Sequence, residues 1–92
     1  MRFEWDEAKN RSNRAKHRLS FETAQRVFLD PLHRSVPSNV VDGEQRWETI
    51  GIVDGVVVIV VLHTYSEVGG EETIRIISAR RATRHERREY EC

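Results

Sequence analysis

Four arginines near the C-terminal end of the chain carry the most evident chemistry of the sequence. Arg75 lies inside a predicted strand, and Arg80, Arg81 and Arg84 cluster where that strand is expected to give way to a helix. A guanidinium group binds phosphate and carboxylate oxygens, and a helix N-terminus also favours an anion. The cluster therefore predicts an anion-binding site, above all at Arg80.

Arg75 and Arg80 are five positions apart, which bears on whether they can act together. Side chains alternate along a strand, so this spacing sends them to opposite faces unless a bulge or the end of the strand intervenes. A cation inside a strand is costly unless it is paired or faces solvent. Arg75 therefore has two interpretations, a phosphate contact or an ion pair with Glu48 on a neighbouring strand.

Histidine offers a second kind of chemistry, because its ordinary pKa of about 6.5 allows proton transfer near neutral pH. The four histidines are His17, His33, His63 and His85. Their spacing forms no pair typical of a metal site, so the sequence predicts no metal and no cofactor. His63 ends the most apolar segment, where a side chain can point into a cleft; a hydrogen-bonded histidine at a strand end is the alternative.

The formal charge of zero arises from 15 basic and 15 acidic residues that are unevenly distributed. Residues 1–18 hold six basic and three acidic side chains, residues 75–92 again hold six and three, and residues 19–74 hold three and nine. The ends are therefore +3 each and the middle is −6. If the ends meet in the fold, they form a basic face suited to RNA or DNA; two solvated helix surfaces are the alternative.

Helix signals dominate the first third of the chain. After a short alternating strand over residues 3–6, Asp6 can cap a helix over residues 7–18. Ser20 can cap a second helix, which must end before Pro31. The stripe expected to face the core on the first helix comprises Ala8, Ser12, Ala15 and Leu19.

Strand signals dominate the second half. A short strand fits around residues 33–36, and the two-residue turn Asp54-Gly55 joins predicted strands over residues 46–53 and 56–65. The second of these begins with an unbroken apolar run, so it should sit centrally and be covered on both faces. Residues 73–81 give a further strand.

A short helix is expected at the C-terminal end, because Thr83 and Glu86 have the spacing of a capping box. The expected fold class is therefore α+β, with two N-terminal helices packed on a three- to four-stranded antiparallel sheet and a short C-terminal helix. A length of 92 residues fits one domain over residues 1–92.

Composition narrows the class of protein. The longest apolar run is the seven residues from Val56 to Leu62, whereas a membrane-spanning helix needs about 20. No apolar leader follows Met1, and the single cysteine, Cys92, excludes an internal disulfide. We therefore expect a cytoplasmic protein with no membrane contact.

Two segments carry a resemblance to a known family. The first comprises Trp5-Asp6-Glu7-Ala8-Lys9, Asn13, Lys16-His17 and Ser20-Phe21-Glu22. The second comprises Ile74-Arg75-Ile76-Ile77-Ser78-Ala79-Arg80-Arg81-Ala82-Thr83, followed by Glu86 and Tyr90. They resemble the opening and closing motifs of the BrnT toxins. The resemblance implies a RelE-like fold and the toxin of a type II toxin–antitoxin system, an endoribonuclease that cleaves RNA and inhibits translation.

Metal-independent RNA cleavage requires a group that takes the 2′-OH proton and cations that stabilise the phosphate. The candidate catalytic residues are His63, Arg75, Arg80 and His17. The candidate RNA-binding residues are Lys16, Arg81, Arg84 and Tyr90. Lys16 and His17 could instead complement a helix dipole, and Tyr90 could anchor the last helix. Glu44 and Glu48 are further candidates for the base.

The resemblance also implies partners. These are RNA as the substrate and a BrnA-like ribbon-helix-helix antitoxin in a 2:2 complex, with DNA contacted only through the antitoxin. The alternative function is a non-catalytic interaction module that keeps the fold and the antitoxin-binding surface.

Overall fold

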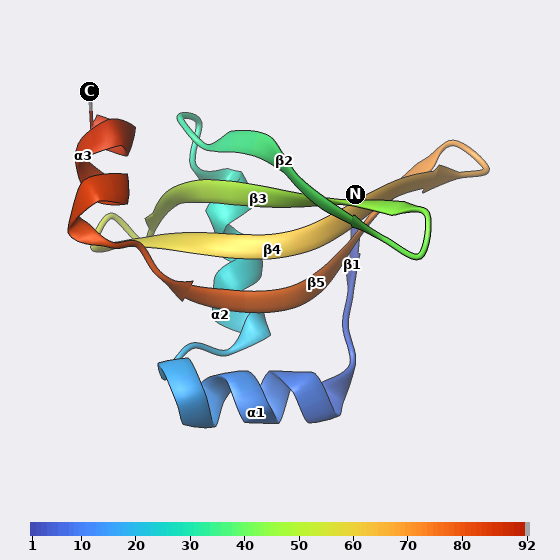
Figure 1. Ribbon diagram of the computed structural model, residues 1–92, viewed down its shortest axis with the longest axis horizontal. Coiled ribbons are helices and arrows are strands. Elements are labelled where there is room, and N and C mark those ends of the chain that lie inside the picture. The colour runs from blue at the N-terminus through green and yellow to red at the C-terminus, as the bar shows by residue number, and fades with distance from the viewer. Residues whose placement is uncertain (92) are drawn as a thin grey trace.

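The computed structural model describes residues 1–91, which form an α+β fold, as expected (Figure 1). The strands are β1 (Arg2–Glu4), β2 (Arg34–Val41), β3 (Glu44–Val53), β4 (Val57–Val68) and β5 (Glu71–Arg81). The helices are α1 (Glu7–His17), α2 (Phe21–Ala24), the 3₁₀ helix η1 (Gln25–Leu29) and α3 (Arg84–Glu91). None of the helices in these residues is long and apolar enough to span a membrane.

The five strands form one mixed sheet in the order β1-β5-β4-β3-β2. The prediction of a three- to four-stranded antiparallel sheet is therefore wrong, because β1 joins the edge parallel to β5 and β2 is a full strand. The polar sequence of β2 contains Pro37, which an edge strand tolerates because its outer side needs no hydrogen bond. Pairing with β3, rather than local propensity, makes this segment a strand.

The prediction of two N-terminal helices is also wrong, because α1 is the one full helix in that region. The second segment makes a single α-helical turn and continues as the tighter η1. This segment lies so close to β3 that a Cβ atom at Gly51 would stand 2.8 Å from Val27 Cγ2. Close packing on the sheet therefore sets the geometry of this segment.

The buried side of α1 differs from the expected stripe. Its helical members Ala8, Ser12 and Ala15 are exposed, and only Leu19, beyond the helix, is buried. The buried helical residues are instead Asn10 and Asn13. Asn13 Nδ2 donates to Ala79 O at 2.9 Å, and Asn13 Oδ1 accepts from Ala79 N at 3.1 Å. The amide thus pairs with β5 as a neighbouring strand would, which fixes α1 beside the sheet.

The hydrophobic core lies on the side of the sheet covered by α2 and η1, which we call the helix face. Its fully buried members include Phe21 and Val27 from the helices and Ile59, Val61 and Ile76 from the strands. The opposite side is the open face, where Val58 and Val60 are also buried. As predicted, β4 is central and its apolar run is covered on both faces.

Two local predictions are confirmed in detail. Asp54 and Gly55 have φ of 55° and 67°, the left-handed geometry expected of the turn between β3 and β4, although Val53 pairs with Val57 and the turn therefore also includes Val56. At the start of α3, the Glu86 amide donates to Thr83 Oγ1 at 3.1 Å and the Thr83 amide donates to Glu86 Oε1 at 2.9 Å. The capping box therefore places α3 at the end of β5.

Candidate functional site

A bulge in β5 brings Arg75 and Arg80 to the same face of the sheet. Arg75 pairs with Thr64 and Arg80 with Val60, and the register shifts between Leu62 and His63. One extra residue in β5 thus offsets the odd spacing, so both arginines lie on the open face. Their positions are four steps of β4 apart, or about 13 Å along the strand.

Arg75 forms an ion pair at the end of the open face that lies near the β2–β3 turn. Its Nη2 donates to Glu44 Oε1 at 2.6 Å, so the expected pairing with Glu48 is wrong. Both side chains are nearly half exposed, and an ion pair of this kind contributes little stability. The pocket around it, of about 380 Å³, is lined by the cations Lys9 and Arg46 and by the carboxylates of Asp6, Asp42 and Glu44. Arg75 is therefore accessible to an anion.

Arg80 is held in place by a bidentate ion pair with Glu86. The guanidinium donates to both Glu86 oxygens, at 2.7 and 3.0 Å. This hydrogen bonding, aided by the Thr83 amide, lowers the Glu86 pKa to about 2 and raises the pKa of Arg80. Glu48 adds a further negative charge near Arg80. Arg80 therefore carries a permanent charge in a fixed orientation.

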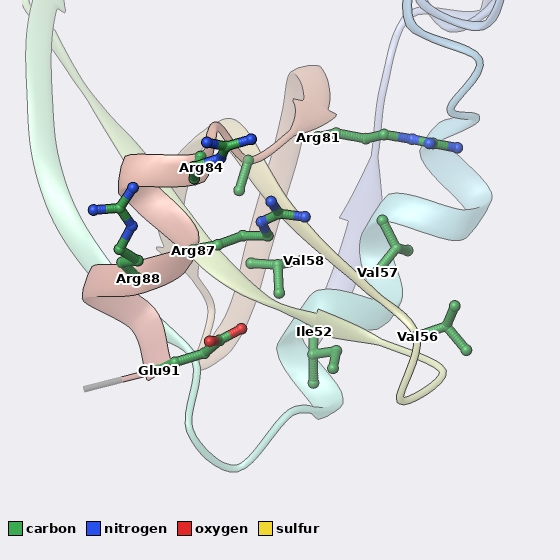
Figure 2. A pocket seen from close by; sticks show the side chains of 10 residues that line it. Ile52, Val56, Val57, Val58, Arg81, Arg84, Arg87, Arg88 and Glu91 are labelled. Carbon is green, nitrogen blue, oxygen red and sulfur yellow. The ribbon is translucent and has the colours of Figure 1, made fainter.

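Between α3 and the β3–β4 hairpin lies a groove of about 570 Å³, which we call the arginine groove. It is lined by Arg81, Arg84, Arg87, Arg88, Glu91, Ala82, Ile52, Val56, Val57 and Val58. Figure 2 shows the arginines of α3 on one side and the apolar side chains of the hairpin on the other. Within residues 1–91, none of the four arginines forms an ion pair. The groove therefore presents the three arginines of α3 above an apolar wall, with Glu91 in the same lining and the Arg81 side chain extending away from them.

The predicted site residues did not include Arg87 and Arg88. They follow Arg84 by three and four positions, a spacing that places all three on one side of a helix. That periodicity was available in the sequence, and it would have extended the cluster predicted from Arg80, Arg81 and Arg84.

A smaller groove of about 200 Å³ adjoins the other side of α3, and we call it the Glu48 groove. Its polar residues are Arg34, Glu48, Glu86 and Glu89, and its apolar ones are Val36, Ile50 and Val60. Arg34 Nη2 donates to Glu89 O at 2.7 Å, which ties β2 to α3. The groove places a carboxylate, Glu48, close to the fixed charge of Arg80.

His63 lies on the helix face, away from both grooves, and only 3% of it is exposed. Its Nε2 lies 2.7 Å from Thr49 Oγ1 and its Nδ1 lies 3.1 Å from Thr64 O. Burial, with a contribution from the nearby His33, lowers the His63 pKa. The side chain is therefore neutral near pH 7 and fully hydrogen-bonded.

The eight predicted site residues do not meet in one cleft. Arg81 and Arg84 line the arginine groove, while Lys16 is exposed and His17 half-buried at the end of α1. The Tyr90 hydroxyl donates to the buried Asp30, which also accepts the Ile52 amide at 2.9 Å. Asp30 thus anchors α3, a role that its sequence position before a proline did not indicate.

No three His, Cys, Asp or Glu side chains cluster as metal ligands in the part of the chain that the structure describes. The ionic side chains of the arginine groove are mainly guanidinium groups, whereas the Glu48 groove holds three carboxylates and one arginine. The arginine groove can hold a polyanion, and the fixed guanidinium of Arg80 can stabilise negative charge on a phosphate.

Comparison with known proteins supports a specific family. Residues 5–86 match the family described as the ribonuclease toxin, BrnT, of type II toxin–antitoxin systems. The fold is similar to the crystal structure of the Brucella abortus ribonuclease toxin, BrnT, with a TM-score of 0.69 and 30% sequence identity, over 91% of this chain and 99% of that chain. A comparison with curated proteins found no match. The chain therefore belongs to the BrnT family of ribonuclease toxins.

Proposed function

We propose that this protein is a metal-independent endoribonuclease that acts in the cytoplasm, cleaves RNA and thereby inhibits translation. The observation that carries the proposal is the arginine groove, whose four arginines have no acidic partner among residues 1–91. Uncompensated arginines in a groove suit the phosphates of a single RNA strand, and apolar side chains beside them suit its bases.

Arg80 and Glu48 are the proposed reaction centre. The 2′-OH proton passes to the Glu48 carboxylate while the 2′-oxygen attacks the adjacent phosphorus. The bond to the 5′-oxygen then breaks and that oxygen takes a proton from solvent, leaving a 2′,3′-cyclic phosphate. Arg80, held by Glu86, stabilises the charge that develops on the phosphate.

The remaining predicted residues are assigned supporting roles. Arg81 and Arg84 hold phosphates in the arginine groove, and Arg75 holds one farther along the open face. Lys16 and His17 contact flanking phosphates beyond the end of α1. Tyr90 keeps α3 in place through Asp30, and His63 supports the fold of the helix face.

The arginine groove is also the surface that we expect the antitoxin to cover. We propose a BrnA-like ribbon-helix-helix partner that binds this surface in a 2:2 complex and supplies all contact with DNA. An acidic segment of the antitoxin would neutralise the arginines and exclude RNA.

The central test is cleavage of a labelled RNA by the purified protein in excess chelator. We expect cleavage that Arg80→Ala and Glu48→Gln each reduce by at least a hundredfold, while Arg11→Ala, an exposed arginine of α1, leaves it unchanged. Absence of cleavage at high protein concentration, together with normal growth after induction without antitoxin, would instead support the non-catalytic interaction module.

A further inference from the structure

A third hollow lies on the helix face, and nothing in the proposed reaction uses it. Its volume is about 270 Å³, and we call it the aromatic pocket. Its lining includes the rings of Phe28, His33, Trp47, His63 and Tyr65, together with Ser35. Pockets for drug-sized ligands run from about 300 to 1,000 Å³, so this one suits a single flat ring system.

The polar groups of the aromatic pocket form a chain of hydrogen bonds with a definite direction. Thr64 O can only accept, so His63 Nδ1 carries the proton and Nε2 of the neutral ring accepts. The Thr49 hydroxyl therefore donates to Nε2, at 2.7 Å. Its oxygen then accepts from Ser35 Oγ, at 2.6 Å.

This direction determines what Ser35 offers to a ligand. Its proton is directed to Thr49, so the part of Ser35 Oγ that faces the pocket is a hydrogen-bond acceptor. A ligand that fits must therefore be flat and aromatic and must carry a donor at its edge. The exocyclic amino groups of adenine, cytosine and guanine are such donors. Uracil has no exocyclic amino group, and its one edge donor, the ring N3–H, is flanked by two carbonyl oxygens that would repel the acceptor Ser35 Oγ.

We propose that the aromatic pocket binds one unpaired nucleobase, which stacks on its exposed aromatic rim and donates an exocyclic amino hydrogen to Ser35 Oγ. Tyr65 supplies an accessible stacking surface, because 46% of it is exposed. Stacking on such rings is the usual way in which proteins hold single-stranded bases.

The route between the aromatic pocket and α3 is short. Asp30 accepts from Tyr90 of α3 through its side chain, and its backbone oxygen lies 2.7 Å from Nδ1 of His33, which lines the pocket. Asp30 thus contacts both α3, through Tyr90, and a residue that lines the pocket, His33. The pocket would then read one base of the RNA whose phosphates lie in the arginine groove, and to this extent the inference rests on the proposed function.

Binding of two matched, uncleavable probes tests the proposal. The probes are 2′-O-methyl oligonucleotides of adenine and of uracil, which lack the attacking hydroxyl, and their affinities are measured by fluorescence anisotropy. We expect the adenine probe to bind about tenfold more tightly. Ser35→Ala should reduce this preference to less than twofold, and Tyr65→Ala should weaken binding of the adenine probe about tenfold.

Two control variants separate stacking from damage to the fold. Tyr65→Phe keeps the ring and should bind as the unmodified protein does. Val68→Ala changes an exposed residue that lines neither this pocket nor the two grooves and should have no effect. Equal affinity for the two probes, or Tyr65→Ala and Ser35→Ala variants that bind like the unmodified protein, would overturn the proposal.

A competition with mononucleotides distinguishes the two sources of a base. If adenosine monophosphate displaces the adenine probe and uridine monophosphate does not, the pocket accepts a free nucleotide; if neither does while the probes still differ, it reads a base within a strand. Both results support a base site. Preference for the adenine probe without cleavage of RNA would support the base site and contradict the proposed function. Cleavage of RNA without any base preference would support the proposed function and contradict the base site.

Discussion

The helix face and the arginine groove differ in whether their polar side chains have partners within the protein. On the helix face and on the neighbouring helix α1, Thr49, His63, Asn10 and Asn13 are buried and hydrogen-bonded, and no buried side-chain nitrogen or oxygen within residues 1–91 lacks a partner. In the arginine groove, four guanidinium groups have no acidic partner among the same residues. A buried polar group must be satisfied by the fold, whereas exposed charges left unmatched are available to a ligand. The comparison therefore separates residues whose polar groups are satisfied within the fold from residues whose charges are free for a ligand.

The largest expected effect comes from reversing charge in the arginine groove. Arg84→Glu with Arg87→Glu should weaken binding of single-stranded RNA at least a hundredfold at low salt, because two phosphate contacts become repulsive. The slope of log affinity against log salt should fall in magnitude by about 1.4, or 0.7 for each lost contact. Affinities measured across a salt series with an uncleavable RNA check this.

A matched reversal on α1 provides the control for that prediction. Arg11 and Arg14 are exposed and lie three positions apart, as Arg84 and Arg87 do. Changing both to glutamate alters the net charge equally, so general electrostatic attraction changes by a similar amount. Equal losses of affinity in the two double variants would show that the groove has no special role.

The next largest effect is expected on the helix face. Asn13→Ala removes the three hydrogen bonds to Leu19 O, Ala79 O and Ala79 N, and it leaves buried backbone groups of β5 unpaired. We expect a loss of about 2–4 kcal/mol in the free energy of unfolding, measured with urea. Ser12→Ala, one position earlier and exposed, should change it by less than about 0.5 kcal/mol. RNA affinity of the folded Asn13→Ala protein should be unchanged.

The sequence predicted correctly those features that residues close together in the chain determine. The turn at Asp54-Gly55 and the capping box from Thr83 to Glu86 depend on residues within four positions of each other, and the structure confirms both. The central place of β4 also follows directly from its apolar run. Each of these predictions used only the conformational or hydropathic preference of adjacent residues.

Features that depend on tertiary contacts were missed. Asn13 is buried because its side-chain amide hydrogen-bonds to the backbone of Ala79, 66 positions away. The hydropathy pattern of a helix carries no information about such a contact. The strand β2 forms because β3 pairs with it. The bulge that places Arg75 and Arg80 on one face arises from the register between β4 and β5. Of the candidate site, the sequence therefore indicated the arginine cluster but not how its members are distributed over the surface.

A smaller effect is expected at the pair of Arg80 and Glu86, a partly exposed charge on the open face that does have an acidic partner. The folded-state pKa of Glu86, about 2, lies below its ordinary value of 4.5. The stabilisation is therefore fully present above about pH 4.5 and is lost as the pH falls toward 2. Because the pair is partly exposed, we expect Glu86→Gln to lower the free energy of unfolding at pH 7 by about 1–2 kcal/mol.

The pH dependence distinguishes this ion pair from a helix cap. Urea unfolding at pH 7 and pH 3 should show the difference between the unmodified protein and Glu86→Gln shrinking at pH 3. Glutamine can still accept from the Thr83 amide, so a difference that persists undiminished at pH 3 would assign the stabilisation to some other contact of Glu86.

The smallest effect concerns His63, a titratable side chain that is buried and hydrogen-bonded on the helix face. Burial lowers its pKa in the folded protein, so the unfolded chain binds the proton more readily. The contribution of His63 to the free energy of unfolding is therefore fully present above the ordinary histidine pKa and declines as the pH falls through and below about 6.5.

Urea unfolding at pH 7 and pH 5 measures this contribution. His63→Gln should be less stable than the unmodified protein at pH 7 and should lose less stability on acidification. His85→Gln, at an exposed histidine of α3, is the matched control and should follow the unmodified protein at both pH values. If His63→Gln also declines as the unmodified protein does, burial of His63 is not the cause of the pH dependence.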